Sequence, residues 1–198
     1  MTVYIAHGFN VKDPRVFFKV GQAFAASNYE VIEIDYGWTG LISARIAVER
    51  EGRRLADIAK PGDIAIGHSN GAAVIARALD LGAPLRQVML VNPALDKRRT
   101  LFRVERADIY HAKDDLAVLF GKFLRWFSPL RLIGKQTTWG EMGRTGYRGE
   151  AVNHYNWNLA HVLEDDERIG HSGAFAWHRV HLLTKHMLSR VIECAPTP

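Results

Sequence analysis

Short apolar runs alternate along the chain with longer segments in which apolar residues recur every three or four positions. A short apolar run bounded by turn residues is typical of a buried strand, and the longer spacing is typical of a helix with one apolar face. The runs predict strands at 2–6, 29–35, 63–66, 87–91 and 107–111. Helices are expected to begin at Asp13-Pro14, at about residue 41 and at residue 72. In the second of these helices, which ends at about residue 59, the apolar residues expected on the inside are Ile42, Ile46, Leu55 and Ile58. Because strands and helices alternate, the pattern predicts a parallel sheet with helices on both faces.

The pattern changes after residue 115. Between about 116 and 149, an aromatic stripe that includes Phe120, Phe123 and Trp126 lies beside basic residues and precedes a stretch rich in glycine. A last strand is expected at 151–157 and a final amphipathic helix at about 174–192. The segment 116–149 is therefore an insertion before the last strand. It either forms a cap over a site or packs its aromatic residues on the sheet as a plain amphipathic helix.

One connection between a strand and a helix, Gly67-His68-Ser69-Asn70-Gly71, carries candidate chemistry. An apolar strand before it and a helical run of small residues after it form the context of a G-x-S-x-G nucleophile elbow. A serine on so sharp a turn has strained backbone geometry, and glycine at both ends removes side chains that would collide. We therefore expect Ser69 to be a nucleophile at a helix N-terminus, where the dipole favours a developing negative charge. The alternative is a glycine-rich connection with a chance serine.

A serine nucleophile needs a base, and the base needs an acid to orient it. Among nine histidines, His171 is favoured because it lies in a glycine-flanked loop before the final helix, from which an imidazole can reach the sheet edge. Asp114 and Asp115 follow the fifth expected strand, and adjacent side chains point in different directions. We prefer Asp115 as the acid, because the apolar run that resumes directly after it would pack there, and Asp114 is the alternative. The order Ser69, Asp115, His171 matches one of the known triad arrangements.

An oxyanion hole needs two backbone N–H groups. We expect one from Asn70, which follows the nucleophile, and the second from Phe9, in the loop after the first strand. His68 is expected to point away from the site, at a position that tolerates any residue.

These motifs together give the chain a clear resemblance to a short α/β-hydrolase. The residues that carry it are His7-Gly8-Phe9, the elbow 67–71, Asp114-Asp115 and Gly170-His171-Ser172-Gly173, and they span nearly the whole chain. The resemblance implies a single domain over 1–198 of class α/β, with about six mostly parallel strands and a cap-like insertion at about 116–149. It implies the same nucleophile, base and oxyanion donors. The doubled aspartate leaves the acid open, and the family fold alone does not fix a substrate.

Composition narrows the function further. The 198 residues are enough for one domain with a sizeable core, and the single cysteine, Cys194, excludes a disulfide within the chain, so we expect a cytoplasmic protein. No apolar run reaches the length of a membrane span. The net charge of +5 is spread along the chain, which gives little support to nucleic-acid binding. The histidines lack a metal-ligand spacing, so no metal or other cofactor is expected.

The leading hypothesis is a cofactor-independent serine hydrolase that cleaves a carboxylic ester or thioester through an acyl-enzyme on Ser69. The second is a non-catalytic binding protein that has kept the α/β-hydrolase fold. The sequence predicts a small-molecule substrate but leaves its acyl chain, its leaving group and the oligomeric state open.

Overall fold

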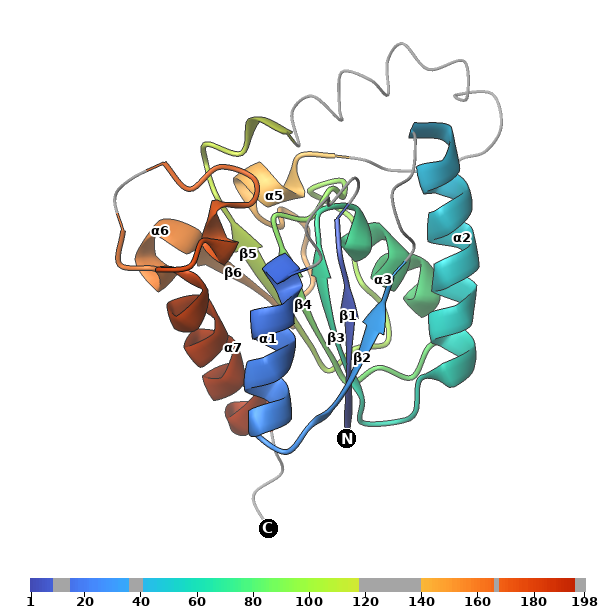
Figure 1. Cartoon of the computed structure of the whole chain (residues 1–198). Helices are drawn as coiled ribbons and strands as arrows, with labels where there is room; N and C mark the ends of the chain where they lie inside the picture. The colour runs from blue at the N-terminus through green and yellow to red at the C-terminus, as the bar shows by residue number, and fades with distance from the viewer. Residues whose placement is uncertain (9–14, 36–40, 118–139, 166–167, 195–198) are drawn as a thin grey trace.

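The computed structural model describes residues 1–8, 15–35, 41–117, 140–165 and 168–194 (Figure 1). Its strands are β1 (Thr2–Ala6), β2 (Glu30–Ile34), β3 (Ile64–His68), β4 (Gln87–Val91), β5 (Arg106–His111) and β6 (His154–Asn158). Its helices are α1 (Arg15–Ala26), α2 (Leu41–Ile58), α3 (Asn70–Asp80), α5 (Met142–Thr145), α6 (Leu159–Val162), the 3₁₀ turn η2 (Gly173–Phe175) and α7 (Val180–Cys194).

The strands form one six-stranded sheet in the order β2-β1-β3-β4-β5-β6, and every neighbouring pair is parallel. The expected parallel α/β sheet of about six strands is confirmed. The chain runs outward from β1 to β2 and then returns to build the rest of the sheet on the other side of β1. Ligands of such sheets bind where the strand order reverses, at the carboxyl ends of the strands. This switch point lies between β1 and β3 and therefore next to Ser69.

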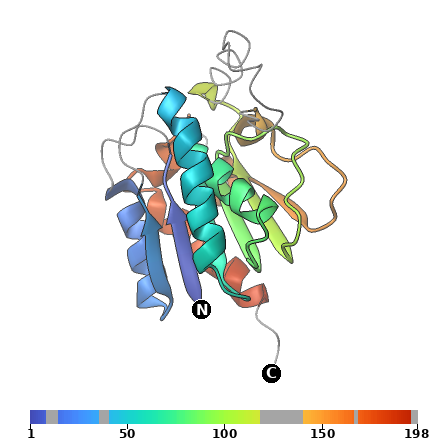
Figure 2. The same ribbon diagram turned by 90° about the vertical axis from the view of Figure 1, so that its right-hand side faces the viewer.

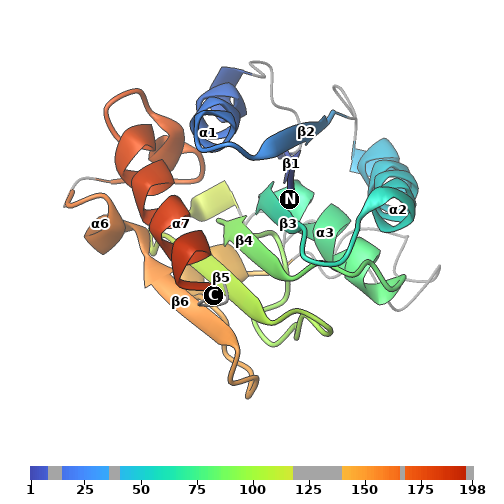
Figure 3. The same cartoon turned by 90° about the horizontal axis from the view of Figure 1, so that it is seen from below.

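Helices cover both faces of the sheet. Figure 3 shows α1 and α7 on one face and α2 and α3 on the other, and Figure 2 shows α2 and α3 from their own side. The alternation of side chains along a strand divides the core in the same way. In β1, Tyr4 and Ala6 pack in the cluster that includes α2 and α3, whereas Val3 and Ile5 pack in the cluster that includes α1 and α7.

Some bounds differ from the sequence-based prediction: the last strand is His154–Asn158 rather than 151–157, and the elbow helix begins at Asn70 rather than at 72. Two larger differences concern α7 and α2. The final helix begins at Val180, about six residues later than expected, because η2 and a short turn occupy the preceding positions. In α2 we expected Ile46 and Ile58 to face inward, but Ile46 is 64% exposed and Ile58 is 36% exposed. The buried stripe of this helix runs through 47, 51 and 55 at a spacing of four, and Ile46 is turned about 100° from it.

The expected cap is described only at its edges. Residues 118–139, with Phe120, Phe123 and Trp126, lie outside the described residues, so the cap stays a prediction. After them, Met142 and Tyr147 belong to the core on the side of α2 and α3. This end of the insertion is therefore part of the main domain.

Candidate active site

Ser69 is placed in a strained turn between β3 and α3. Its backbone has φ 52° and ψ −116°, a combination that a residue with a side chain rarely adopts. The N–H of Ser69 donates to the Val91 carbonyl at 3.1 Å, and its carbonyl accepts from the N–H groups of Ala72 and Ala94 at 3.2 and 3.1 Å. The strain is thus held by bonds to the neighbouring strand and to the helix. The side chain is largely enclosed, since Ser69 is 8% exposed.

The two glycines of the elbow are required by close approach of other atoms. A Cβ at Gly67 would lie 2.7 Å from Cδ1 of Ile75 and 2.9 Å from the backbone nitrogen of Ala72. A Cβ at Gly71 would overlap the carbonyl of Ala6 at the end of β1. The glycine at 71 therefore lets α3 start directly against β1, and this fixes the position of Ser69 relative to the switch point.

The structure brings His171 and Asp115 together from positions 56 residues apart. Nδ1 of His171 donates to the two carboxylate oxygens of Asp115 at 2.8 and 3.0 Å. Asp115 is completely buried in the turn that follows β5, four residues past the end of the strand, and the imidazole remains partly accessible. Because a carboxylate only accepts, Nδ1 carries the proton in the neutral ring, and Nε2 has a lone pair.

His171 also lies beside the elbow. The His171 and His68 ring centroids are 4.7 Å apart, and His68 directly precedes Ser69. Within the described residues no hydrogen bond joins the Ser69 hydroxyl to His171 in this conformation. Such bonds are often long without substrate and tighten when it binds. Of the expected oxyanion donors, Asn70 begins α3 next to Ser69, whereas Phe9 lies outside the described residues.

Asp114, the alternative acid, points to the backbone of the histidine loop. Its Oδ2 accepts from the Gly170 N–H at 2.9 Å. The two adjacent aspartates thus divide their contacts between the imidazole and the loop that carries it. The far end of the same loop is held by Arg179, whose Nε donates to Asp165 at 2.6 Å and which is 6% exposed.

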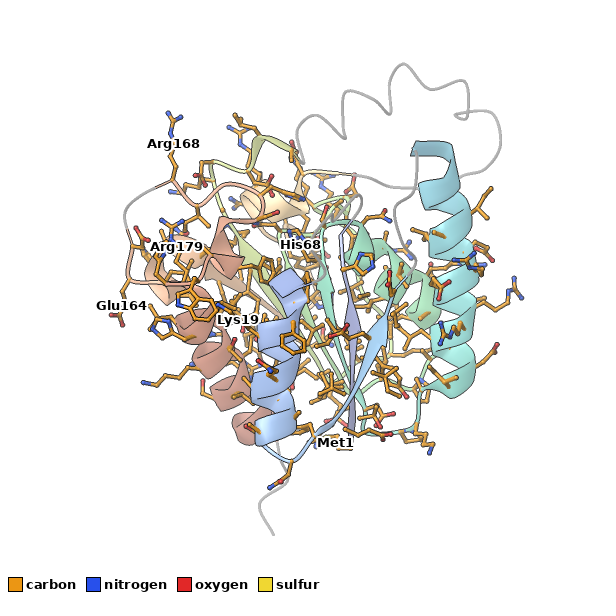
Figure 4. All side chains as sticks on the ribbon, in the orientation of Figure 1. Met1, Lys19, His68, Glu164, Arg168 and Arg179 are labelled. Atoms are coloured by element: carbon orange, nitrogen blue, oxygen red, sulfur yellow. The ribbon has the colours of Figure 1, made fainter. Side chains whose placement is uncertain are left out.

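His68 and Asn92 contact the same loop, and sequence reasoning assigned neither of them this contact. Nε2 of His68 and Nδ2 of Asn92 both donate to the His171 carbonyl, at 2.9 and 2.8 Å. The expectation that His68 points away is corrected by this contact, whereas its tolerance of other residues stays a prediction. Figure 4 shows His68 at the carboxyl end of the sheet. Burial, with the charge of a protonated His171 as a smaller cause, lowers the pKa of His68 to about 3.

Seven other histidines complete the nine of the chain. His111 is the last residue of β5, and burial lowers its pKa. His7, after β1, pairs with Asp35 at 3.0 Å, and His186 bonds the buried Tyr110 hydroxyl at 3.1 Å. His154 accepts from the Leu101 N–H, and burial lowers its pKa to about 4. The exposed histidines are His161, His178 and His181. Within the described residues, no cluster of three potential ligands could hold a metal ion. No described helix has both the length and the apolar character that a membrane span requires.

The sheet order, the helices on both faces and the elbow after β3 define an α/β-hydrolase fold. Solved structures of that fold superpose on nearly the whole chain. Mouse α/β hydrolase domain-containing protein 10 has a TM-score of 0.64 at 10% identity, over 98% of this chain and 90% of its own. The pyrethroid hydrolase PytH has a TM-score of 0.58 at 11% identity, over 100% and 99% of the two chains.

A third structure, the esterase domain of a Rhodothermus marinus protein, has a TM-score of 0.55 at 16% identity, over 96% of this chain and 84% of its own. No protein-family model matches the sequence, and no curated protein matches it. At these identities the likeness establishes the fold, while the reaction has to be argued from the residues of this chain.

Proposed function

We propose that the chain is a serine hydrolase that cleaves a small-molecule carboxylic ester or thioester through an acyl-enzyme on Ser69. One observation carries the proposal: a histidine bonded to a buried aspartate lies beside a strained serine elbow, at the switch point of the sheet. Two of the structural neighbours are named as an esterase domain and as a pyrethroid hydrolase, which supports the ester class.

In the proposed reaction, Nε2 of His171 takes the proton from the Ser69 hydroxyl as Oγ attacks the substrate carbonyl carbon. Asp115 keeps Nδ1 protonated and stabilises the imidazolium that forms. The Asn70 N–H, at the start of α3, and the Phe9 N–H are assigned to the oxyanion. The imidazolium then protonates the leaving alcohol or thiol. A water molecule, deprotonated by the same Nε2, releases the acid and restores Ser69.

The test combines a covalent probe with substrates. A fluorophosphonate is expected to label the protein at Ser69, and Ser69→Ala should remove the label. p-Nitrophenyl esters of increasing chain length should then be hydrolysed, and their kcat/KM values would give the acyl preference. A folded wild-type protein that binds such esters but neither turns them over nor takes the probe would support the non-catalytic binding protein instead.

A further inference from the structure

Three side chains from the ends of three neighbouring strands converge on two backbone residues, Gly170 and His171. His68 is the last residue of β3, Asn92 follows β4, and Asp114 lies beyond β5. The loop that they hold reaches the sheet edge from a position about 60–100 residues further along the chain. Contacts between parts of the chain that are distant in sequence thus meet on this loop.

Asn92 makes the most extensive contact. It is completely buried, and its Nδ2 group donates to the carbonyls of both Gly170 and His171, at 3.0 and 2.8 Å. Its backbone has φ 44°, which asparagine tolerates better than most residues. Gly143 lies directly behind it, since a Cβ there would be 2.6 Å from the Asn92 carbonyl carbon. The Asn92 backbone is thus packed against Gly143, while the side-chain amide bonds the loop.

His68 provides a second donor to the His171 carbonyl. A carbonyl oxygen only accepts, so Nε2 of His68 carries the proton and Nδ1 does not. The ring is enclosed by Phe17 and Phe175, at centroid distances of 5.7 and 5.0 Å. An apolar side chain would satisfy that enclosure at least as well. The imidazole therefore has a purpose that packing alone does not explain.

Asp114 completes the set as an acceptor, whereas His68 and Asn92 are donors. Its carboxylate accepts the Gly170 N–H. The loop backbone is thus held through two carbonyls and one N–H. Such a set fixes both the position and the tilt of the peptide planes that carry the imidazole.

We propose that His68, Asn92 and Asp114 are positioning residues, which clamp the backbone of Gly170–His171 so that the imidazole stays aligned between Asp115 and Ser69. The inference rests on the proposed function and adds residues to it. Displacements of about 1 Å can lower a rate about 100-fold, so loss of a clamp donor should lower kcat while KM changes little.

The first test compares His68→Gln with His68→Leu. Glutamine can place an amide N–H near the position of Nε2, whereas leucine fills the apolar enclosure without a donor. We expect H68L to lower kcat roughly 10- to 100-fold and H68Q to remain close to wild type. Thermal stability should show the opposite order, with H68L at least as stable as H68Q. If His68 only packs, the variant with the higher kcat should also be the more stable one. That result would contradict the proposal.

The second test uses Asn92→Asp, with Asn153→Asp as its matched control. Asn153 also donates its amide to a backbone carbonyl, that of Val104 at 2.7 Å, but it lies at the amino ends of the strands, before β6. Both changes remove an N–H donor from a side chain of the same shape. We expect N92D alone to lower kcat roughly 10- to 100-fold, with KM little changed.

A spectroscopic readout makes the test independent of turnover. The His171 Nδ1 proton, bonded to Asp115, should give a low-field proton resonance that Asp115→Asn removes. H68L and N92D should broaden or shift it, whereas H68Q and N153D should leave it in place. If the wild type is active and H68L and N92D match H68Q and N153D in kcat and in this resonance, the positioning role is wrong and the proposed function stands. A wild type that neither hydrolyses esters nor takes the probe at Ser69 would overturn the proposed function first.

Discussion

Two buried aspartates at opposite edges of the sheet have different surroundings. Asp63, just before β3 at the amino edge, accepts from the N–H groups of Thr2 and Lys60, both at 2.9 Å, and from the Tyr4 hydroxyl at 3.2 Å. These donors are uncharged and fixed by the backbone or by packing. Asp115, at the carboxyl edge, is instead bonded to the partly accessible imidazole of His171, which comes from a distant loop.

The burial of residues with positive φ also differs between the two edges of the sheet. At the amino edge, Asn28 and Arg103 have positive φ in exposed turns. At the carboxyl edge, Ser69 and Asn92 have positive φ while buried. Among the described residues, His68 Nδ1 and Asn92 Oδ1 are also buried without a hydrogen-bond partner. Buried strain and unpaired polar atoms reduce stability, and such features are often found at functional sites. Ser69 and Asn92 thus hold a positive φ in the interior, whereas the positive-φ turns named at the amino edge are exposed.

The largest effect is expected at Ser69. Ser69→Ala should lower kcat on the order of 10⁴-fold or more, because only the nucleophilic hydroxyl is removed. Ser69→Gly should be equally inactive but more stable than S69A by about 1 kcal/mol, since glycine accepts a positive φ without strain. Ester hydrolysis and chemical denaturation would measure the two effects. An alanine variant that hydrolyses esters at the wild-type rate would refute the nucleophile.

The second effect separates the adjacent aspartates. Asp115→Asn should lower kcat about 10³-fold or more, because the amide disturbs the tautomer and orientation of His171. Asp114→Asn should lower it far less, since an amide oxygen can still accept the Gly170 N–H. Steady-state kinetics of the two purified variants would decide between them. The reverse ranking would make Asp114 the acid.

The reciprocal change at the amino edge should affect stability rather than rate. Asp63→Ala leaves the Thr2 and Lys60 N–H groups without this acceptor, while the Tyr4 hydroxyl keeps the Ile58 carbonyl at 3.1 Å. We expect the free energy of unfolding to fall by about 1–3 kcal/mol or more, with kcat unchanged below the unfolding range. Urea denaturation and ester hydrolysis on the same sample would test both. A loss of kcat without a loss of stability would contradict a purely structural role for Asp63.

Acid should weaken the carboxyl edge through His68. Its pKa is about 3 in the folded protein, against an ordinary value of 6.5, so the unfolded chain binds more protons between these values. The stability contributed by neutral His68 is complete above about pH 6.5 and is lost as the pH falls towards 3. The free energy of unfolding of His68→Leu should therefore fall less steeply with decreasing pH over this range than that of wild type. Equal pH dependences of the midpoint would contradict a buried neutral His68.

Alkali should weaken the amino edge through Tyr4, and this effect should be the smallest. Burial and the Asp63 carboxylate raise the pKa of Tyr4 from 10.0 to about 12. The unfolded chain therefore loses its proton first, and stability from the neutral hydroxyl falls as the pH rises from about 10 to 12. Tyr4→Phe should show a smaller loss than wild type over this window in thermal melts. Identical losses would place the alkaline sensitivity in other groups.

Most of the fold was readable from the sequence because the periods of apolar residues are local. The run Gln87–Val91 predicts β4 at its observed bounds, and the elbow motif predicts a strand, a turn and a helix around Ser69. Boundaries failed where tertiary contacts decide, as at Val180. The prediction that Ile46 faces inward was also wrong. The side of an amphipathic helix that is buried depends on the element that packs against it.

The sequence by itself determined that glycine must flank Ser69, that aspartates follow β5 and that a histidine precedes the last helix. Only the tertiary structure decided which aspartate meets the imidazole. Asp114 and Asp115 are adjacent and chemically identical, so local sequence supported only a preference for Asp115, from the apolar run that follows it. The loop at Gly170–His171 places an N–H opposite one carboxylate and an imidazole opposite the other. The same folding brings His68 and Asn92 to the His171 carbonyl, because the ends of parallel strands gather residues that are distant in sequence at one edge.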